Sequence, residues 1–282
     1  MRNPRPTCPN ELCQNHTDPP SDFYRKKGYR RPVNAPSQKI PRYQCKVCGA
    51  YFSATRAKGI HGQRRPDINE QIFKLAVSGV SMRRMVELVG CHHRTVASKI
   101  THLAEQAKKK HAQFLEDTRT SCVMIDELET FMHSRYKQLS MSMAVRVKTG
   151  HVLGFSVARK PCNQPRGQIK YSWTVDHRPH AFHGMLLSIQ DALRPGCTVI
   201  TDGHPSYPKW LGKGLANYQH RILHSPDTPG YDPLFVINHT FAKMRNDLAR
   251  LGRKTWTTTK TIKGLEEHLW LWVAWTNGYR LR

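Results

Sequence analysis

Ser121-Cys-Val-Met-Ile-Asp-Glu-Leu-Glu-Thr-Phe131 is a stretch in which three consecutive apolar residues lead to one carboxylate, Asp126. This pattern predicts a buried strand that carries Asp126 at the end of an extended apolar run. An ionised carboxylate is costly to bury unless it takes up a proton or gains a compensating cation. The placement of Asp126 after a buried apolar run therefore suggests that its carboxylate is protonated or binds a cation.

The run Cys197-Thr-Val-Ile-Thr-Asp202-Gly203 repeats the pattern, since an apolar, β-branched segment ends in an aspartate and then a turn glycine. Two strands that each end in an aspartate can place both carboxylates on one divalent metal ion. We therefore predict a metal site formed by Asp126 and Asp202. The alternative is that both are ordinary strand-end and turn aspartates, which are common before glycine.

The composition favours a nucleic-acid partner. The chain has 282 residues and a formal charge of +25, which suits a polyanionic partner, DNA or RNA before an anionic membrane. A merely soluble basic protein is the alternative. The amino terminus has no apolar leader, and the longest apolar run, residues 269–275, is too short to cross a bilayer. We expect a soluble, cytoplasmic protein that makes no membrane contact.

Two close cysteine pairs lie in the basic amino-terminal part of the chain, Cys8 with Cys13 and Cys45 with Cys48. Zinc takes four soft ligands in a tetrahedron, and two short-spaced pairs supply them. We predict that these four cysteines bind Zn²⁺, with a loop or hairpin between the pairs. The spacing of the first pair is loose, so His16 is an alternative to Cys13, and ordinary buried thiols are the alternative to a metal site.

The next segment has helical spacing. A first helix is followed by a second that Ser81 can cap, Gly90 makes a turn, and a third helix keeps Val96, Ile100 and Leu103 for packing. This order predicts a helix-turn-helix whose last helix reads the major groove of DNA. A purely structural three-helix module is the alternative. The residues expected to face DNA are His93, Arg94, Thr95, Ser98 and Lys99.

After a charged segment, the period of the sequence becomes that of strands. Residues 139–147 and 151–158 extend the Asp126 strand into an antiparallel meander, and a helix over 182–193 leads to the Asp202 strand. This order resembles a ribonuclease H-like core. Residues 159–179 are expected to form a long polar loop without an assigned role, residues 212–232 a second loop-rich segment, and residues 234–250 and 261–275 closing helices.

The predicted fold class is thus a multidomain α+β protein. We expect a basic zinc-ribbon-like module over residues 1–62 and a helix-turn-helix domain over 63–105. A linker over 106–120 then leads to a catalytic domain, with the α/β ribonuclease H-like core, over 121–282.

Nearly the whole chain resembles the DDE transposases of the insertion sequence one type. The most specific blocks are Thr201-Asp-Gly-His-Pro-Ser-Tyr207 and Leu248-Ala-Arg-Leu-Gly-Arg-Lys-Thr255. The zinc half-site Arg42-Tyr-Gln-Cys-Lys-Val-Cys48, the helix-turn-helix and the strand Ile125-Asp-Glu127 add to the resemblance. In that family the first part is often a separate small DNA-binding protein, whereas here both parts are in one chain.

The resemblance implies cut-and-join transposition in a bacterial, nucleoid-associated setting. Mg²⁺ (or Mn²⁺) would be held by two aspartates and a third acid, with Asp126 bridging two ions and Asp202 binding one. The implied partners are double-stranded DNA, both the terminal inverted repeats and the target, and further copies of the chain in a homo-oligomer on DNA.

The third catalytic position departs from the family pattern, because the glutamate of the family falls on Asn238. An asparagine can bind a metal through its carbonyl oxygen but brings no charge. Asn238 is therefore either a neutral ligand, or another acid such as Glu127 or Asp232 serves, or this copy has decayed. We favour the first of these.

A basic block near the carboxyl terminus is a candidate for phosphate contacts, and a solvated basic face is its alternative. It comprises Arg245, Arg250, Arg253, Lys254 and Lys260. Trp270, Trp272 and Trp275 are expected in core packing, and Tyr43 and Tyr207 as structural support.

Three functions fit the sequence. The first is a transposase that cleaves and joins DNA strands. The second is a catalytically inactive DNA-binding protein, either a repressor or a decayed copy. The third is a ribonuclease H-like nuclease that cuts without joining.

Overall fold

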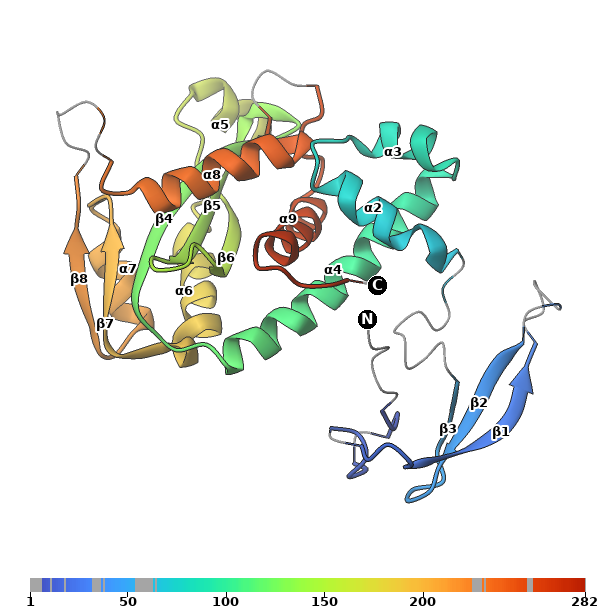
Figure 1. Ribbon diagram of the computed structural model, residues 1–282. Coiled ribbons are helices and arrows are strands. Elements are labelled where there is room, and N and C mark those ends of the chain that lie inside the picture. Colours follow the sequence, from blue (N-terminus) through green and yellow to red (C-terminus); the bar gives the residue numbers. More distant parts are fainter. Residues whose placement is uncertain are drawn as a thin grey trace. The chain divides into compact units, whose positions relative to one another are not determined.

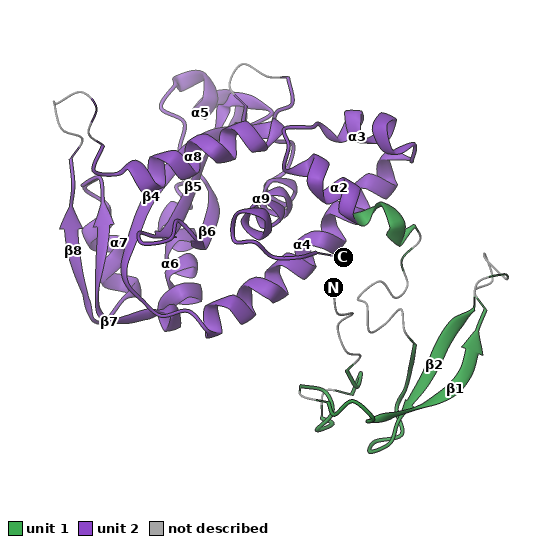
Figure 2. Cartoon of the chain, in the orientation of Figure 1, with its two compact units in different colours: residues 1–69, 282 green, residues 70–281 purple. Residues whose placement is uncertain are grey.

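The computed structural model of the chain (Figure 1) describes residues 7–10, 12–17, 19–31, 37, 39–53, 63, 65–224, 230, 232–252 and 256–281. These residues form a mixed α+β structure with two sheets. The chain divides into two compact units, Met1–Asn69 together with Arg282, and Glu70–Leu281 (Figure 2).

The first unit contains a small antiparallel sheet in the order β1-β2-β3. The sequence predicts only a loop or hairpin between the two cysteine pairs, so the third strand is an addition. Four aromatic rings, those of Phe23, Tyr24, Tyr43 and Phe52, pack against one another and give this unit a small core beside the cysteines. The strands are β1 (Tyr24–Arg30), β2 (Ile40–Cys45) and β3 (Tyr51–Ser53), followed by a short 3-10 helix, Pro66–Ile68.

The second unit is built on a sheet in the order β6-β5-β4-β7-β8. The central strand β4 is antiparallel to β5, and β5 to β6, whereas β4 is parallel to β7. The predicted meander and parallel fourth strand are therefore confirmed, and β8 is a strand in a segment that we expected to be loop-rich. The strands are β4 (Thr120–Met132), β5 (Ser134–Arg146), β6 (Val152–Arg159), β7 (Leu193–Thr201) and β8 (Tyr218–Ile222).

Eight α-helices are found in the described residues, and none of these helices is both long and apolar enough to cross a membrane. Three short 3-10 turns accompany them, over residues 66–68, 190–192 and 249–251. The helices are α2 (Asn69–Ala76), α3 (Met82–Val89), α4 (His93–Glu116), α5 (Pro165–Tyr171), α6 (Arg178–Ile189), α7 (Tyr207–Gly214), α8 (Phe235–Asp247) and α9 (Ile262–Thr276).

Of the helices α2, α3 and α4, the second has the predicted signals at both of its ends. The Ser81 hydroxyl accepts a hydrogen bond from the Arg84 backbone N–H and caps α3, and Gly90 ends α3 with a φ of 63°. The segment expected to be a linker, residues 106–120, instead continues α4 to Glu116. This part of α4 is helical because it packs along α9, where Ala107 and His111 are buried.

The two faces of β4 are covered by different helices. Val123 and Ile125 lie in a buried cluster with Phe182 and other side chains of α6 and α7. On the other face, Trp270 of α9 contacts the ring of Phe155 in β6. Since neighbouring residues of a strand point to opposite faces, residues 124 and 126 of β4 share the α9 side of the sheet.

Gly154 sets the distance between β6 and α6. A Cβ at this position would lie 2.7 Å from Cγ2 of Ile189 and 3.4 Å from Cγ of Met185. No side chain fits there unless α6 moves away from the sheet.

We predict that Gly154→Ala lowers the free energy of unfolding by about 1–3 kcal/mol, the usual cost of overpacking a core. Gly184, on α6 itself, is the matched control, because a Cβ added there would have no atom within 4 Å. Gly184→Ala should be neutral or stabilising by up to about 1 kcal/mol, because alanine is the better helix former. Urea denaturation of both variants measures the difference, and equal effects would contradict the close packing at Gly154.

Candidate active site and metal centre

Asp126 lies in the middle of β4, and Asp202 directly follows the end of the neighbouring parallel strand β7. Met124 of β4 pairs with Ile200 of β7, so a step of two residues along each strand leads to Asp126 and Asp202. The negative charge of Asp202 also raises the pKa of Asp126, as expected of two carboxylates near each other. The structure therefore brings together the two acids that the sequence analysis selected, although 75 residues separate them in the chain.

The surroundings of Asp126 disfavour its ionised form. Burial raises the pKa of Asp126 to about 6, and the nearby negative charges of Asp202 and Glu127 also raise it, while the hydrogen bond from the Glu127 backbone N–H opposes the shift. The Tyr207 hydroxyl donates to Oδ1 of Asp126 at 3.5 Å. No cation is among the groups that shift the pKa of this carboxylate. A bound metal cation would favour its ionised form.

Asp202 begins a tight turn that leads to α7. Its Oδ1 accepts a hydrogen bond from the His204 backbone N–H at 3.0 Å. Gly203 has a φ of 88°, and a Cβ there would lie 2.6 Å from Cγ2 of Ile222, so glycine is required at this point. The turn also brings in Tyr207, whose contact with Asp126 the sequence analysis missed because it treated this tyrosine only as support.

Glu127 lies on the opposite face of β4 from Asp126. Its Oε1 accepts hydrogen bonds from the hydroxyls of Ser140 (2.7 Å) and Ser142 (3.1 Å), and its Oε2 is 3.5 Å from Nη1 of Arg178. These partners satisfy the carboxylate on the α6 side of the sheet. Both oxygens of Glu127 thus have partners, which does not favour Glu127 as a third ligand beside Asp126 and Asp202.

Asn238 lies in the first turns of α8, a helix that packs against β4. Its Nδ2 donates to Oδ2 of Asp232 at 2.9 Å, and Oδ1 of Asp232 accepts from the Leu234 backbone N–H. The carboxylate of Asp232 is therefore engaged at the start of α8. Among the described residues, no third acid, histidine or cysteine gathers with Asp126 and Asp202.

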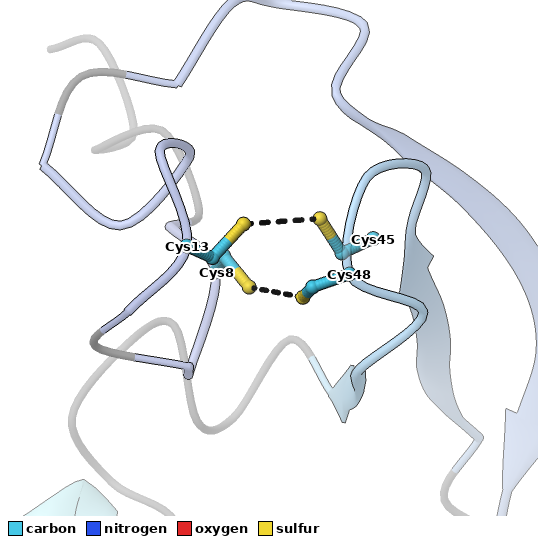
Figure 3. A group of neighbouring side chains, drawn as sticks. All are labelled: Cys8, Cys13, Cys45 and Cys48. Atoms are coloured by element: carbon cyan, nitrogen blue, oxygen red, sulfur yellow. Dashed lines mark hydrogen bonds between the residues drawn. The ribbon is translucent and has the colours of Figure 1, made fainter.

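The four predicted zinc ligands form a cluster in the first unit. Side chains of Cys8, Cys13, Cys45 and Cys48 point toward one another (Figure 3), and all four sulfur atoms lie within 4.8 Å of one another. The Sγ–Sγ distances are 3.3 Å for Cys8 with Cys48 and 3.8 Å for Cys13 with Cys45. A tetrahedral Zn²⁺ with bonds of about 2.3 Å needs sulfur atoms about 3.8 Å apart, so the cluster fits this ion.

Two neighbouring residues support the cluster. Nδ2 of Asn15, which is buried, donates to Sγ of Cys45 at 3.5 Å, the kind of outer contact that orients a thiolate ligand. Nδ1 of His16 lies 2.8 Å from the backbone oxygen of Cys8. Cys13, rather than the alternative His16, is therefore the fourth member of the cluster.

The residues predicted to face DNA from α4 divide into two groups. His93, Arg94 and Ser98 are exposed, and Thr95 is partly exposed. Lys99 is only 4% exposed, so its prediction as an outward DNA contact is wrong. Lys99 directly precedes the buried Ile100 on a helix that packs against both α3 and α9, so more than one face of α4 is covered.

The carboxyl-terminal basic block is more dispersed than the sequence suggests. Arg250 is partly buried against α9, where its Nη2 lies 3.4 Å from Nε2 of His268. Arg245 lies beside the α2–α3 turn and lines an open cavity of about 590 Å³ with Ser81 and Arg84. Lys260 is exposed. Arg253 and Lys254 lie outside the described residues.

Core packing is predicted for three tryptophans, and the structure agrees for Trp270 and Trp272 but not for Trp275. Trp272 is buried and donates through Nε1 to Asp247, and Trp270 packs on Phe155, as expected for core residues. Trp275 is 50% exposed and its ring meets that of Phe73 from α2, so it joins α9 to the three-helix segment at the surface.

Comparison with models of known protein families gives no match, and comparison with curated proteins gives none either.

We predict that Asp126→Asn stabilises the protein at pH 7 by about 1–3 kcal/mol, since it removes a carboxylate whose ionised form is disfavoured by folding. The folded pKa of about 6 lies above the unfolded value, so the ionised form costs stability above that pKa. The difference between variant and wild type should shrink as the pH falls from about 6 to about 4.

Urea denaturation without added divalent metal measures this difference, and Asp191→Asn, at an exposed position, is the control. Added Mg²⁺ should stabilise the wild type more than Asp126→Asn, because only the wild type keeps both carboxylates. A destabilised Asp126→Asn protein would contradict the electrostatic account of this site.

We also predict that the purified chain carries one Zn²⁺ and that Cys45→Ser abolishes it. Without the metal the first unit has only its small aromatic core, so protease cleavage within residues 7–53 should become faster. Native mass spectrometry gives the metal count. Cys91→Ser, at a cysteine outside the cluster, should keep both the zinc and the protease resistance.

Proposed function

We propose that this chain is a DNA transposase that binds the ends of its element and performs metal-dependent strand cleavage and strand transfer. The observation that carries the proposal is the pair Asp126, within β4, and Asp202, which directly follows the neighbouring parallel strand β7. A largely buried carboxylate with a second carboxylate nearby is a suitable base for a divalent metal ion.

The topology of the second unit supports this proposal. An antiparallel meander, a helix that crosses over the sheet and a strand parallel to the first give the order β6-β5-β4-β7-β8. This is the arrangement expected of a ribonuclease H-like core with acids on its first and fourth strands. The resemblance to the insertion sequence one transposases, noted from the residues, assigns these positions to Asp126 and Asp202.

The helices before the sheet support a DNA-binding role. We infer that α2, α3 and α4 form a helix-turn-helix, because a capped α3 and a glycine turn lead into a helix that begins with exposed His93 and Arg94. We further infer that the four-cysteine cluster with its small sheet is a zinc-ribbon-like module. A formal charge of +25 suits a protein that contacts DNA through several modules.

The site residues would have different roles in the proposed reaction. Bound Mg²⁺ (or Mn²⁺) would supply charge neutralisation at the phosphate and activation of a water or a 3′-hydroxyl. Asp126 and Asp202 would hold the ion from neighbouring strands. Tyr207, which is buried beside Asp126, would fix the orientation of that carboxylate through its hydroxyl.

One observation favours a second candidate, a DNA-binding repressor or decayed copy without catalytic activity. Asn238 stands where the family has glutamate, and its amide is engaged with Asp232. For the transposase, Asn238 would offer its carbonyl oxygen as a neutral ligand, because the hydrogen bond to Asp232 uses only the amide nitrogen.

We predict Mg²⁺-dependent cleavage and joining of DNA that carries the inverted ends of the element. Asp126→Ala and Asp202→Ala should each lower the rate at least about 100-fold, because loss of one carboxylate removes a metal ligand. Asn238→Ala should also reduce strand transfer severely. End binding, measured without Mg²⁺, should stay unchanged in all three variants.

The control is Asp191→Ala, which should cleave as the wild type does. Binding of the ends without cleavage by the wild type, in Mg²⁺ or Mn²⁺, would favour the repressor. Cleavage without joining would favour a ribonuclease H-like nuclease. Wild-type activity in Asn238→Ala would exclude that residue as a ligand.

A further inference from the structure

Residues 159–173, part of the segment expected to be a long polar loop, fold back onto the first residues of β5 and include α5. Nε1 of Trp173 donates to the backbone oxygen of Gln138 in β5, and the Cys162 N–H donates to the Trp173 backbone oxygen. A Cβ on Gly167 would lie 2.4 Å from Sγ of Cys162, so α5 packs closely. The segment is thus a fixed part of the second unit.

This segment and the start of β5 form a surface of alternating cations and aromatic rings, which we name the α5 surface. Each of its three rings has two cations over it, at 4.7 to 5.9 Å from the ring centroid. The two tyrosine rings are themselves stacked, with centroids 6.2 Å apart. The members are Arg135, Tyr136, Lys137, Arg159, Arg166, Lys170, Tyr171 and Trp173.

The cations of the α5 surface lack acidic partners. Arg135, Arg159, Arg166 and Lys170 are exposed, Lys137 is partly exposed, and none of them forms an ion pair with a carboxylate among the described residues. The neighbouring Lys160 differs, because it pairs with Glu129. Five unneutralised cations on one surface require an anionic partner or solvent.

The aromatic rings restrict the conformations of these cations, and this favours phosphates over bases as the groups that they bind. Long basic side chains lose conformational freedom on binding, and a cation already held over a ring loses less. Two arginines lie over the ring of Tyr136, and two lysines lie over the ring of Tyr171. A nucleic-acid base could stack on either ring only by displacing a cation. The surface therefore suits phosphates rather than bases.

The α5 surface lies beyond the acid pair along β4. Asp126 pairs with Met143 of β5, and Phe131 pairs with Gln138, the neighbour of Lys137. Five residues of strand span about 17 Å at about 3.3 Å per residue, which corresponds to roughly five base pairs of DNA at about 3.4 Å each. A duplex that is cut at Asp126 and Asp202 and runs along β4 would have phosphates about five base pairs from the cut at this distance.

We propose that the α5 surface binds the phosphate backbone of the DNA next to the cleavage point, as a contact independent of base sequence and separate from the three-helix segment. This inference rests on the proposed function, because it takes DNA to be the substrate at the acid pair. The surface positions the substrate and takes no part in the chemical step.

The test is the salt dependence of binding of the full chain to a short duplex of arbitrary sequence, without added Mg²⁺, by fluorescence anisotropy. The triple variant Arg135→Ala, Arg166→Ala, Lys170→Ala should reduce the slope of log K against log salt by about 2 to 3, since each lost phosphate contact removes about 0.9. The control removes the same charge from the other end of the sheet, at the exposed Lys148, Arg194 and Lys213. Its slope should change by less than about 1.

A second pair of variants tests the rings. Tyr171→Leu should weaken binding because it removes the ring under Lys137 and Lys170, and Tyr171→Phe should restore it. Equal slopes for the two triple variants would overturn the proposal, as would a loss confined to single-stranded DNA, which indicates base stacking. If the slope falls as predicted but the wild type never cleaves DNA, the phosphate surface stands and the proposed catalysis fails.

Discussion

The second unit depends on the parallel pairing of β4 with β7, because this register places two like charges in adjacent positions. Met124 and Ile200 pair within the sheet, and two residues further along each chain segment come Asp126 and Asp202. The buried cluster between the sheet and α6 holds this register, since a slip by one residue would turn Ile125 and Val199 out of it. The core thus provides the free energy that keeps two carboxylates in an unfavourable arrangement.

The carboxylates of Glu127 and Asp126, neighbours in β4, have different hydrogen-bond and ion-pair partners. On the α6 face, Glu127 has two serine hydroxyls and the guanidinium of Arg178, which in turn pairs with Asp176 and lies over the ring of Trp210. A buried ion pair of this kind fixes geometry more than it stabilises the fold. Asp126, by contrast, has a backbone N–H and a long contact with a tyrosine hydroxyl, and no cation pairs with it in the described part of the chain. The second aspartate lies close to this carboxylate.

Helix α4 connects the three-helix segment, which consists of α2, α3 and α4 itself, to the sheet of the second unit. This helix runs without a break from His93, at the surface proposed to meet DNA, to Glu116, four residues before β4 begins. A helix of 24 residues is about 36 Å long, so it links two distant parts of the unit rigidly. A backbone hydrogen bond from Gly79 to Asp247, between the α2–α3 turn and the end of α8, joins them a second time.

The sequence by itself determined the features that depend on nearby residues: the strand of Asp126, the cap at Ser81, the turn at Gly90 and the spacing of the cysteines. It also selected Asp126 and Asp202, because a charge at the end of an apolar run is a local signal. Tertiary structure alone decided the partners, such as Arg178 for Glu127 and Asp232 for Asn238. It also buried Lys99 and made residues 159–173 a cationic surface, since these outcomes depend on which distant elements pack against a segment, and periodicity carries no information about that.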